Sequence, residues 1–162
     1  MRVITVQYIE TQNFDQIELE KLFEIDNNID SVVVSSGAYE LIELPGIIAY
    51  ENGKILGLLS YKKFNDYIEI ISLHSNIENI GIGSNLITKT EEIAINIGIK
   101  RIKVITTNEN LRALYFYQKK GYRITEILPN AVDKARTLKP TIPLVGENGI
   151  EIKDEIVLIR KI

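Results

Sequence analysis

Short apolar stretches, alternating or continuous, dominate the first half of the chain, and this pattern is typical of β-strands. They predict strands at residues 3–9, 47–50, 55–61 and 67–73. Residues 51–54, Glu-Asn-Gly-Lys, contain the Asn-Gly pair that favours a tight hairpin turn. The last three of these strands are therefore expected to form an antiparallel meander.

In the second half of the chain the apolar residues change to helical spacing. One helix is expected from about 82 to 97, with Gly98 in the place of a left-handed C-cap. Another is expected to begin at Asn110, an N-capping residue, and to end at Gly121. Further strands are expected at residues 101–107, 123–127 and 155–161.

Two other segments carry weaker helical signals. Asn13 and Gln16 resemble a capping box, which predicts a helix that opens there and runs to about Ile25. Residues 128–150 contain prolines and glycines around one short helical stretch at 131–138. The second segment is therefore expected to be mostly irregular.

The size and composition of the chain favour one compact domain. With 162 residues, 45% of them hydrophobic, residues 1–162 are expected to bury a single core. No stretch approaches the roughly 20 apolar residues of a membrane span, and the chain opens with an alternating pattern in place of a signal-peptide block. We therefore expect a cytoplasmic protein that does not bind membranes.

Charge and residue usage narrow the chemistry. The net charge of -3 argues against a general attraction to nucleic acid, which depends on Lys and Arg side chains that neutralise phosphates. The chain has no cysteine and one histidine, so we expect no disulfide, no thiolate nucleophile and no metal site. Catalysis would then rely on carboxylates, tyrosines, backbone amides or a cofactor.

A glycine-rich turn joins the predicted strand 67–73 to the predicted helix 82–97. Its residues 78–84 are Glu-Asn-Ile-Gly-Ile-Gly-Ser. At the start of a helix the free amides and the helix dipole favour an anion, and glycines let a phosphate approach the backbone. Leu86 occupies the place of the third glycine of a dinucleotide fingerprint, and the Gly-Lys-Ser/Thr of a P-loop does not occur. The turn is thus a candidate diphosphate site, or else a tight connection that binds nothing.

This turn resembles motif A of the GNAT superfamily of N-acetyltransferases, Gln/Arg-x-x-Gly-x-Gly/Ala, which holds the pyrophosphate and pantetheine of acetyl-CoA. Glu78 stands where that consensus has Gln or Arg. A carboxylate would repel a diphosphate, so we expect Glu78 to point into solvent. The resemblance implies acetyl-CoA as the co-substrate, bound by Asn79, Ile80, Gly81, Ile82, Gly83 and Ser84.

A second stretch, residues 106–122, is similar to motif B of the same superfamily, N-x-x-A-x-x-x-Y-x-K-x-G-F/Y. Asn110 and Tyr117 lie seven residues apart, about two helical turns, and so face the same side of the predicted helix. The resemblance implies that both contact acetyl-CoA, whereas taken alone Asn110 would be a helix cap and Tyr117 a core aromatic. The other matches to the motif are Ala113, Lys119, Gly121 and Tyr122.

Together the two motifs imply a GNAT-like α/β fold and an acetyl-CoA-dependent N-acetyltransferase. The expected central sheet is mixed: it begins as an antiparallel meander, opens into a parallel splay near the glycine turn, and is flanked by helices. Three basic residues near the second motif are expected on a solvated face, unless one of them meets the adenosine 3'-phosphate. They are Arg112, Lys119 and Lys120.

Acetyl transfer to an amine needs a proton for the departing thiolate, a donor for the thioester oxygen and a base for the amine. Tyr117 is the candidate general acid, because a phenol of pKa about 10 can protonate a thiolate whose thiol has a pKa of about 8.5. The backbone amide near Leu73 is the candidate oxyanion donor and part of the cofactor site. Glu69 is the candidate general base, with His74 as a second candidate. If Glu69 is not catalytic, the alternation of Glu69, Ile71 and Leu73 predicts an exposed strand position.

The acceptor is expected to be an amine on a small molecule or a peptide, which the sequence does not identify. Residues 128–150 are expected to lie over the acceptor groove, where Arg136 and Lys139 could bind an acceptor carboxylate. Residues 26–45 mix helix-breaking, extended and turn signals, and they could form part of a homodimer face. Two alternatives stay open: an acyl-CoA-binding module without catalysis, and a structural or interaction protein on the same meander.

Overall fold

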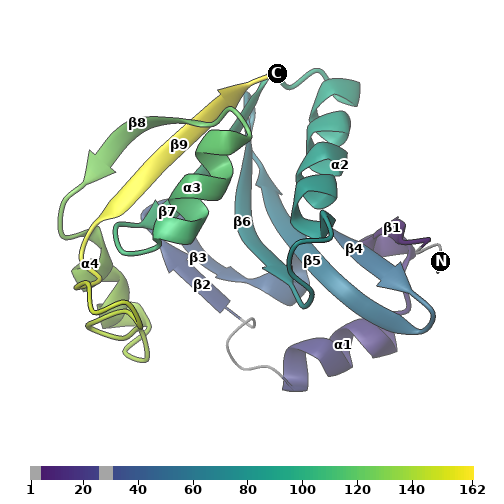
Figure 1. Ribbon diagram of the computed structural model, residues 1–162, viewed down its shortest axis with the longest axis horizontal. Helices are drawn as coiled ribbons and strands as arrows, with labels where there is room; N and C mark the ends of the chain where they lie inside the picture. The colour runs from purple at the N-terminus through teal and green to yellow at the C-terminus, as the bar shows by residue number, and fades with distance from the viewer. Residues whose placement is uncertain (1–4, 26–30) are drawn as a thin grey trace.

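The computed structural model describes residues 5–25 and 31–162, and Figure 1 shows its elements. Its strands are β1 (Gln7–Glu10), β2 (Ser31–Val34), β3 (Gly37–Glu40), β4 (Gly46–Glu51), β5 (Lys54–Lys63), β6 (Ile68–Ser75), β7 (Arg101–Thr107), β8 (Arg123–Leu128) and β9 (Glu155–Lys161). Its α-helices are α1 (Gln16–Ile25), α2 (Ile82–Asn96), α3 (Leu111–Lys119) and α4 (Ala131–Leu138), and the short 3-10 helices η1 and η2 cover Thr11–Asn13 and Leu41–Glu43. None of the described helices is long and apolar enough to cross a membrane.

Seven strands form one mixed sheet in the order β1-β4-β5-β6-β7-β9-β8. β1, β4, β5 and β6 pair antiparallel, β6 and β7 pair parallel, and β9 pairs antiparallel with both β7 and β8. β2 and β3 form a separate hairpin. The predicted α/β fold, with an N-terminal meander followed by a parallel step, is confirmed.

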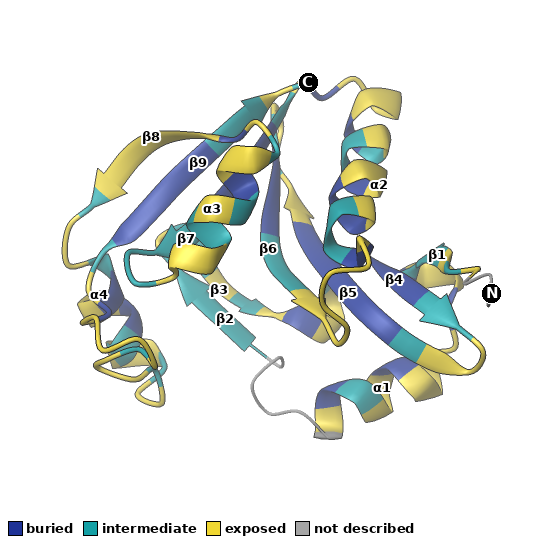
Figure 2. Cartoon of the chain, viewed as in Figure 1, coloured by how far each residue is buried: buried dark blue, intermediate teal, exposed yellow. Residues whose placement is uncertain are grey.

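Hydrophobic cores lie on both faces of this sheet (Figure 2). Ile47 and Ile48 are neighbours on β4 and belong to different cores, as the alternation of a strand requires. The core of Ile47 includes Leu86 of α2 and Tyr117 of α3, so these two helices cover the same face. The core of Ile48 includes Leu19 of α1, which covers part of the other face.

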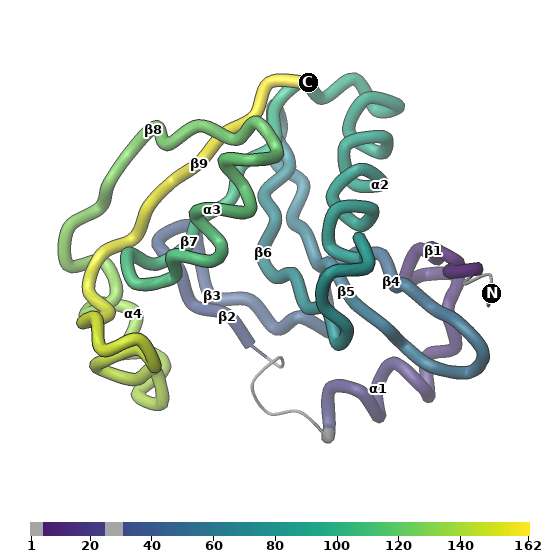
Figure 3. Tube along the Cα trace, in the orientation of Figure 1, coloured from purple at the N-terminus to yellow at the C-terminus, as the bar shows by residue number. Residues whose placement is uncertain are grey.

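The parallel pair β6–β7 opens after three residues. Ile68–Ile70 pairs with Ile102–Val104, and the described register continues no further. β6 nevertheless runs on to Ser75 and β7 to Thr107, so the two strands diverge (Figure 3). The facing edges of the diverging strands leave main-chain groups that this pairing does not satisfy. The predicted splay between β6 and β7 is thus present.

A β-bulge in β6 decides which residues share a face. The register of β6 against β5 skips Ile71, which is therefore an extra residue. Leu73 consequently packs with the core of Ile70, beneath α2, whereas Ile71 packs with the core on the other face. The predicted alternation of Glu69, Ile71 and Leu73 on one face is wrong, because a bulge reverses the alternation beyond it.

The first helix begins later than predicted. Residues Thr11–Asn13 form η1, and α1 begins at Gln16. The Asp15 carboxylate accepts the N–H of Glu18 at 2.9 Å, so Asp15 is the N-cap. The Gln16 side chain donates instead to main-chain carbonyls that precede the helix. The predicted capping box on Asn13 is wrong, because the 3-10 turn incorporates that residue.

The ambiguous segment 26–45 contains the hairpin β2–β3 and the 3-10 helix η2. Residues 26–30 lie outside the described residues, as do residues 3 and 4 of the first predicted strand. The valines of residues 32–34 belong to β2, which pairs with β3 and packs against α4. The hairpin therefore lies between the sheet and segment 128–150, on the side of the sheet away from α2 (Figure 1).

Candidate functional site

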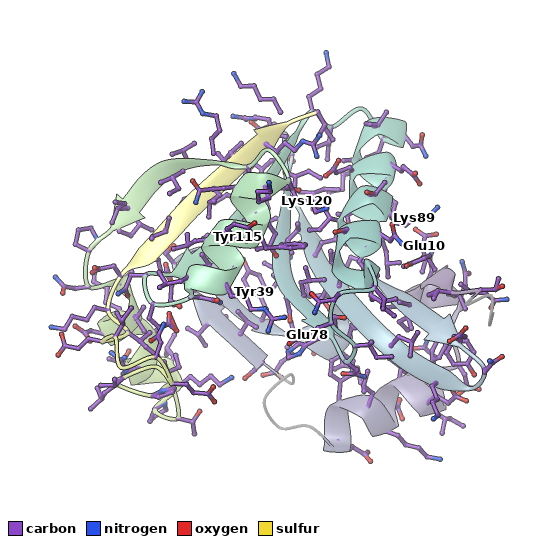
Figure 4. The ribbon with its side chains drawn as sticks, in the orientation of Figure 1. Glu10, Tyr39, Glu78, Lys89, Tyr115 and Lys120 are labelled. Atoms are coloured by element: carbon purple, nitrogen blue, oxygen red, sulfur yellow. The ribbon has the colours of Figure 1, made fainter. Side chains whose placement is uncertain are left out.

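A cleft of about 600 Å³ runs between the glycine turn with the start of α2 and the first two turns of α3. Figure 4 labels Glu78 at the glycine turn and Tyr115 on α3, which stand on its two sides. The floor is the last part of β6 beyond the point where β7 diverges. Its lining contains Leu73, His74, Glu78, Asn79, Gly81, Ile82, Gly83, Ser84, Asn110, Arg112, Tyr115, Phe116 and Tyr117.

The glycine turn aims the start of α2 into this cleft. Asn79 and Gly81 have φ angles of 63° and 81°, in the left-handed region, and Gly81 is the N-cap of the helix. The first main-chain bond of α2 runs from the Asn85 N–H to the Gly81 carbonyl at 3.0 Å. The preceding amides, Ile82 to Ser84, therefore have no acceptor within the helix. They form a candidate anion site at the positive end of the helix dipole.

The two glycines of the turn serve different purposes. Gly81 adopts a φ that side chains disfavour, and a Cβ there would meet nothing within 4 Å. Gly83 has ordinary backbone angles, but a Cβ would lie 3.5 Å from Phe116 and 3.9 Å from Leu73. Gly81 thus shapes the turn, whereas a Cβ at position 83 would only add ordinary contacts with Phe116 and Leu73.

Asn110 both caps α3 and lines the cleft. Its side-chain oxygen accepts the N–H of Ala113 at 3.1 Å, which is the bond of an N-cap. Among residues 5–25 and 31–162 no hydrogen bond from the side-chain NH₂ of Asn110 is found, so its two donors are available to a ligand. The cap interpretation and the ligand interpretation of Asn110 are therefore compatible.

Tyr117 lies at the inner end of the cleft. Its side chain is only 5% exposed, and its ring packs edge-on against Phe116 and Tyr122 at centroid distances of 5.2 and 5.4 Å. No hydrogen bond to the Tyr117 hydroxyl is found within residues 5–25 and 31–162. Burial raises the pKa of this phenol well above its ordinary value. The hydroxyl is therefore protonated at neutral pH.

Leu73 brings a main-chain amide to the same end of the cleft. The N–H of Asn76, just past β6, bonds to the Leu56 carbonyl of β5 at 2.8 Å. Because N–H directions alternate along a strand, the N–H of Leu73 points away from β5, toward the gap that β7 leaves. This amide therefore points into the gap between β6 and β7.

Glu69 lies outside the lining of the cleft and on the opposite face of the sheet. Its side chain is 1% exposed, so the expectation of an exposed strand position is wrong. The hydroxyl of Ser36 donates to one carboxylate oxygen, and Lys103 Nζ stands 3.6 Å from the other, which has no hydrogen-bond donor within the described chain. Burial raises the pKa of Glu69, and the Ser36 bond and Lys103 oppose that shift.

The hairpin β2–β3 covers two buried carboxylates on that face. Besides the Ser36–Glu69 bond, the main-chain N–H of Ser35 donates to both oxygens of Glu155, at 3.0 and 3.1 Å. Tyr39, labelled in Figure 4, shares a 2.8 Å hydrogen bond with the Ser36 hydroxyl. Apart from the extended signal of residues 32–34, no sequence feature indicates this network.

Of two other predicted residues, one lines the cleft and the other does not. Ile80, predicted to contact the cofactor, is 43% exposed and is not among the lining residues. His74 is exposed and belongs to the lining, on the segment of β6 beyond Leu73. Of the predicted cofactor set, Ile80 alone stands outside the cleft.

Glu78 does not simply project into solvent. It is largely exposed, but its carboxylate lies 2.6 Å from a guanidinium nitrogen of Arg112, on the first turn of α3. The hydrogen bond from Arg112, more than its charge, lowers the pKa of the Glu78 carboxyl. The expected repulsion between Glu78 and a diphosphate is therefore offset by a cation at the same end of the cleft.

Arg136 and Lys139 support the fold of segment 128–150. Arg136 donates to the carbonyls of Ile142, Pro143 and Ile152 and pairs with Asp133. Lys139 donates to the carbonyl of Ser31, the first residue of β2, at 2.7 Å. These side chains are engaged with the protein itself, in place of the acceptor carboxylate that the sequence suggested.

Comparison with known proteins agrees with this geometry. The model of the family described as "Acetyltransferase (GNAT) family" matches residues 12–122. The uncharacterized protein YxbD of Bacillus subtilis (strain 168) is 48% identical over 132 residues, which cover 81% of this chain and 83% of YxbD. The IAA acetyltransferase from Bacillus cereus ATCC 14579 is 20% identical, with a TM-score of 0.72 over 98% of this chain and 100% of that chain. A GNAT family acetyltransferase from Elizabethkingia anophelis, solved with acetyl-CoA bound, is 24% identical, with a TM-score of 0.65 over 98% of each chain.

Proposed function

The chain belongs to the GNAT family of acetyltransferases, and on that premise we propose that it transfers an acetyl group from acetyl-CoA to a primary amine of a small molecule or peptide. The observation that carries the proposal is the cleft, with free helix amides on one wall and Asn110 and Tyr117 on the other. Main-chain amides at the start of a helix can hold a diphosphate without a cluster of lysine side chains.

Acetyl-CoA would lie along the cleft with its diphosphate on the amides of Ile82 to Ser84. The pantetheine arm would run along the cleft from the start of α2 toward Tyr117, and all of these residues line the cleft. The side-chain NH₂ of Asn110 would donate to a pantetheine carbonyl. The thioester would then reach Tyr117 and the N–H of Leu73, and both residues line the cleft.

The chemistry is a direct attack of the amine nitrogen on the thioester carbonyl. The N–H of Leu73 would stabilise the negative charge that forms on the carbonyl oxygen, which is commonly the largest contribution of an acyl-transfer site. As the carbon–sulfur bond breaks, the thiolate would take the proton of Tyr117, and solvent would later return a proton to the phenolate. Burial raises the pKa of Tyr117 and makes it a weaker acid toward the thiolate than an ordinary phenol, so the proton would have to move as the carbon–sulfur bond breaks.

The amine would approach from the face covered by the hairpin β2–β3, through the splay between β6 and β7. Glu69 lies on this face beside the last paired residues of the two strands. Its carboxylate would take the ammonium proton, directly or through water, and its raised pKa makes it a stronger base than an ordinary carboxylate. His74 is the second candidate for this step, from the side of the cleft.

Two measurements test the proposal. Calorimetry should detect CoA binding with a matching rise in melting temperature, because a ligand that binds only the folded state stabilises it. Incubation with acetyl-CoA and a panel of primary amines should release thiol above the rate seen without amine. Tight CoA binding with no amine-dependent thiol release would support a non-catalytic acyl-CoA-binding module, and no binding at all would support an interaction protein.

A further inference from the structure

One cation lines the cleft, and it sits where helix electrostatics disfavour it. Among the described residues of the lining, Arg112 is the single Lys or Arg. It lies on the first turn of α3, where the helix dipole is positive and a second positive charge is destabilising. Its side chain is 74% exposed. Helix stability and core packing therefore give no reason for an arginine at this position.

Glu78 also carries a charge where electrostatics disfavour it. It directly precedes the anion site of the glycine turn, where a carboxylate would repel a bound diphosphate. The ion pair of 2.6 Å between Glu78 and Arg112 joins the glycine turn to α3 across the cleft, so each charge compensates the other. The pair leaves most of the guanidinium N–H groups unused, because Arg carries five donors.

We propose that Arg112 is the cation that binds the phosphates of acetyl-CoA, and that Glu78 is a positioning residue that holds Arg112 across the cleft. This inference rests on the proposed function. It gives the donor site a preference for phosphate-bearing donors over the bare pantetheine thioester, which presents no anion to Arg112. The carboxylate at position 78 then acts through Arg112 and contacts no phosphate itself.

The geometry explains why the pair is suited to this role. A guanidinium stays charged at all relevant pH values and can contact a carboxylate on one edge and phosphate oxygens on another. Fixing the flexible side chain of Arg112 before the ligand arrives reduces the entropy that binding must overcome. An arginine at position 78 would provide charge without this bridge to α3.

The test compares the affinity of acetyl-CoA with that of acetyl-pantetheine, which lacks every phosphate. Arg112→Gln should weaken acetyl-CoA about 10- to 50-fold, the value of one charge-assisted hydrogen bond, and leave acetyl-pantetheine unchanged. Glu78→Gln should weaken acetyl-CoA about 2- to 4-fold, because Arg112 remains but loses its anchor. Arg101→Gln is the matched control, since Arg101 forms an exposed ion pair with Asp66 outside the cleft.

The outcomes separate this inference from the proposed function. If wild type binds acetyl-CoA but Arg112→Gln binds it equally well, the role of Arg112 is wrong and the function stands. Equal losses for acetyl-CoA and acetyl-pantetheine would also overturn it, because Arg112 would then act on shared parts of the ligand. Tighter acetyl-CoA binding by Glu78→Gln would show that Glu78 repels the phosphates and would overturn its positioning role. If wild type binds no acetyl-CoA, the proposed function itself fails.

Discussion

The two halves of the proposed active site are built in different ways. The donor half consists of the glycine turn and α3, two continuous segments whose side chains and amides are local to a helix start. The acceptor half brings together Glu69, Ser36 and Lys103 from three separate parts of the chain. Local segments can be recognised from sequence because helix geometry fixes their directions, whereas the acceptor half depends on how distant strands and a hairpin pack.

The largest expected effect comes from the donor half. Tyr117→Phe keeps the buried ring and its contacts, so CoA affinity should persist while turnover falls about 10²- to 10⁴-fold, as for loss of a general acid. Steady-state kinetics and CoA calorimetry on the same variant measure both. Tyr122→Phe is the control, because the buried Tyr122 hydroxyl has no partner in the described chain and its ring touches Tyr117. Full turnover in Tyr117→Phe would make this tyrosine a core residue without a catalytic role.

A second change in the donor half tests binding alone. Gly83→Glu places a carboxylate in the cleft beside the anion site, and CoA affinity should fall about 100-fold or more from charge repulsion and lost space. Hydrogen exchange should show that CoA slows the amides of Ile82 to Ser84 in wild type and not in the variant. Gly83→Ala is the matched control: its Cβ would lie at ordinary contact distance from Phe116, so it should fold and lose much less. Unchanged amide exchange in wild type would exclude the glycine turn as the phosphate site.

The acceptor half should respond through pH. Glu69→Gln removes the proposed base, and turnover should fall about 10-fold or more without a change in CoA affinity. Burial raises the Glu69 pKa, so wild-type turnover should decline as pH falls through a value above the ordinary 4.5, and the variant should lack that decline. Glu155→Gln, the other buried carboxylate under the hairpin, should retain it. If Glu69→Gln keeps the acid limb, the base lies elsewhere, with His74 the next candidate.

The same raised pKa fixes the sign of a stability effect. A carboxyl that binds its proton more tightly in the folded state contributes stability that is complete below the unfolded pKa of about 4.3 and is lost as pH rises through the folded pKa. Wild type should therefore lose stability over this range relative to Glu69→Gln. Thermal unfolding of the two proteins from pH 4 to about pH 8 measures the difference, which should vanish at the acid end.

The limits of sequence interpretation follow the same division. Residues 131–138, 101–107 and 155–161 were predicted with the bounds that the structure has, because periodic apolar residues and turn residues mark their ends. The extra residue Ile71 has no local signature, yet it reverses the face of Leu73. The Glu78–Arg112 pair likewise joins residues 34 positions apart, and charge at either position alone predicts only a solvated side chain. Register and tertiary packing decide such contacts.

The smallest expected effect tests whether the hairpin tunes the acceptor half. The Ser36 hydroxyl donates to Glu69 and opposes the rise in its pKa, so Ser36→Ala should raise that pKa further and move the acid limb of turnover to higher pH. At pH values well above this limb, turnover should change less than about threefold, because the base is still present.

Ser35→Ala is the matched control: Ser35 binds Glu155 through its main-chain N–H, which alanine keeps. A structural role alone would lower the melting temperature of Ser36→Ala, by the loss of about 1 kcal/mol, and leave the pH profile in place. An unshifted acid limb in Ser36→Ala would mean that the hairpin does not influence the pKa of the base. A shift seen in Ser36→Ala and not in Ser35→Ala would show that the hairpin tunes Glu69, although Ser36 and Glu69 are 33 residues apart.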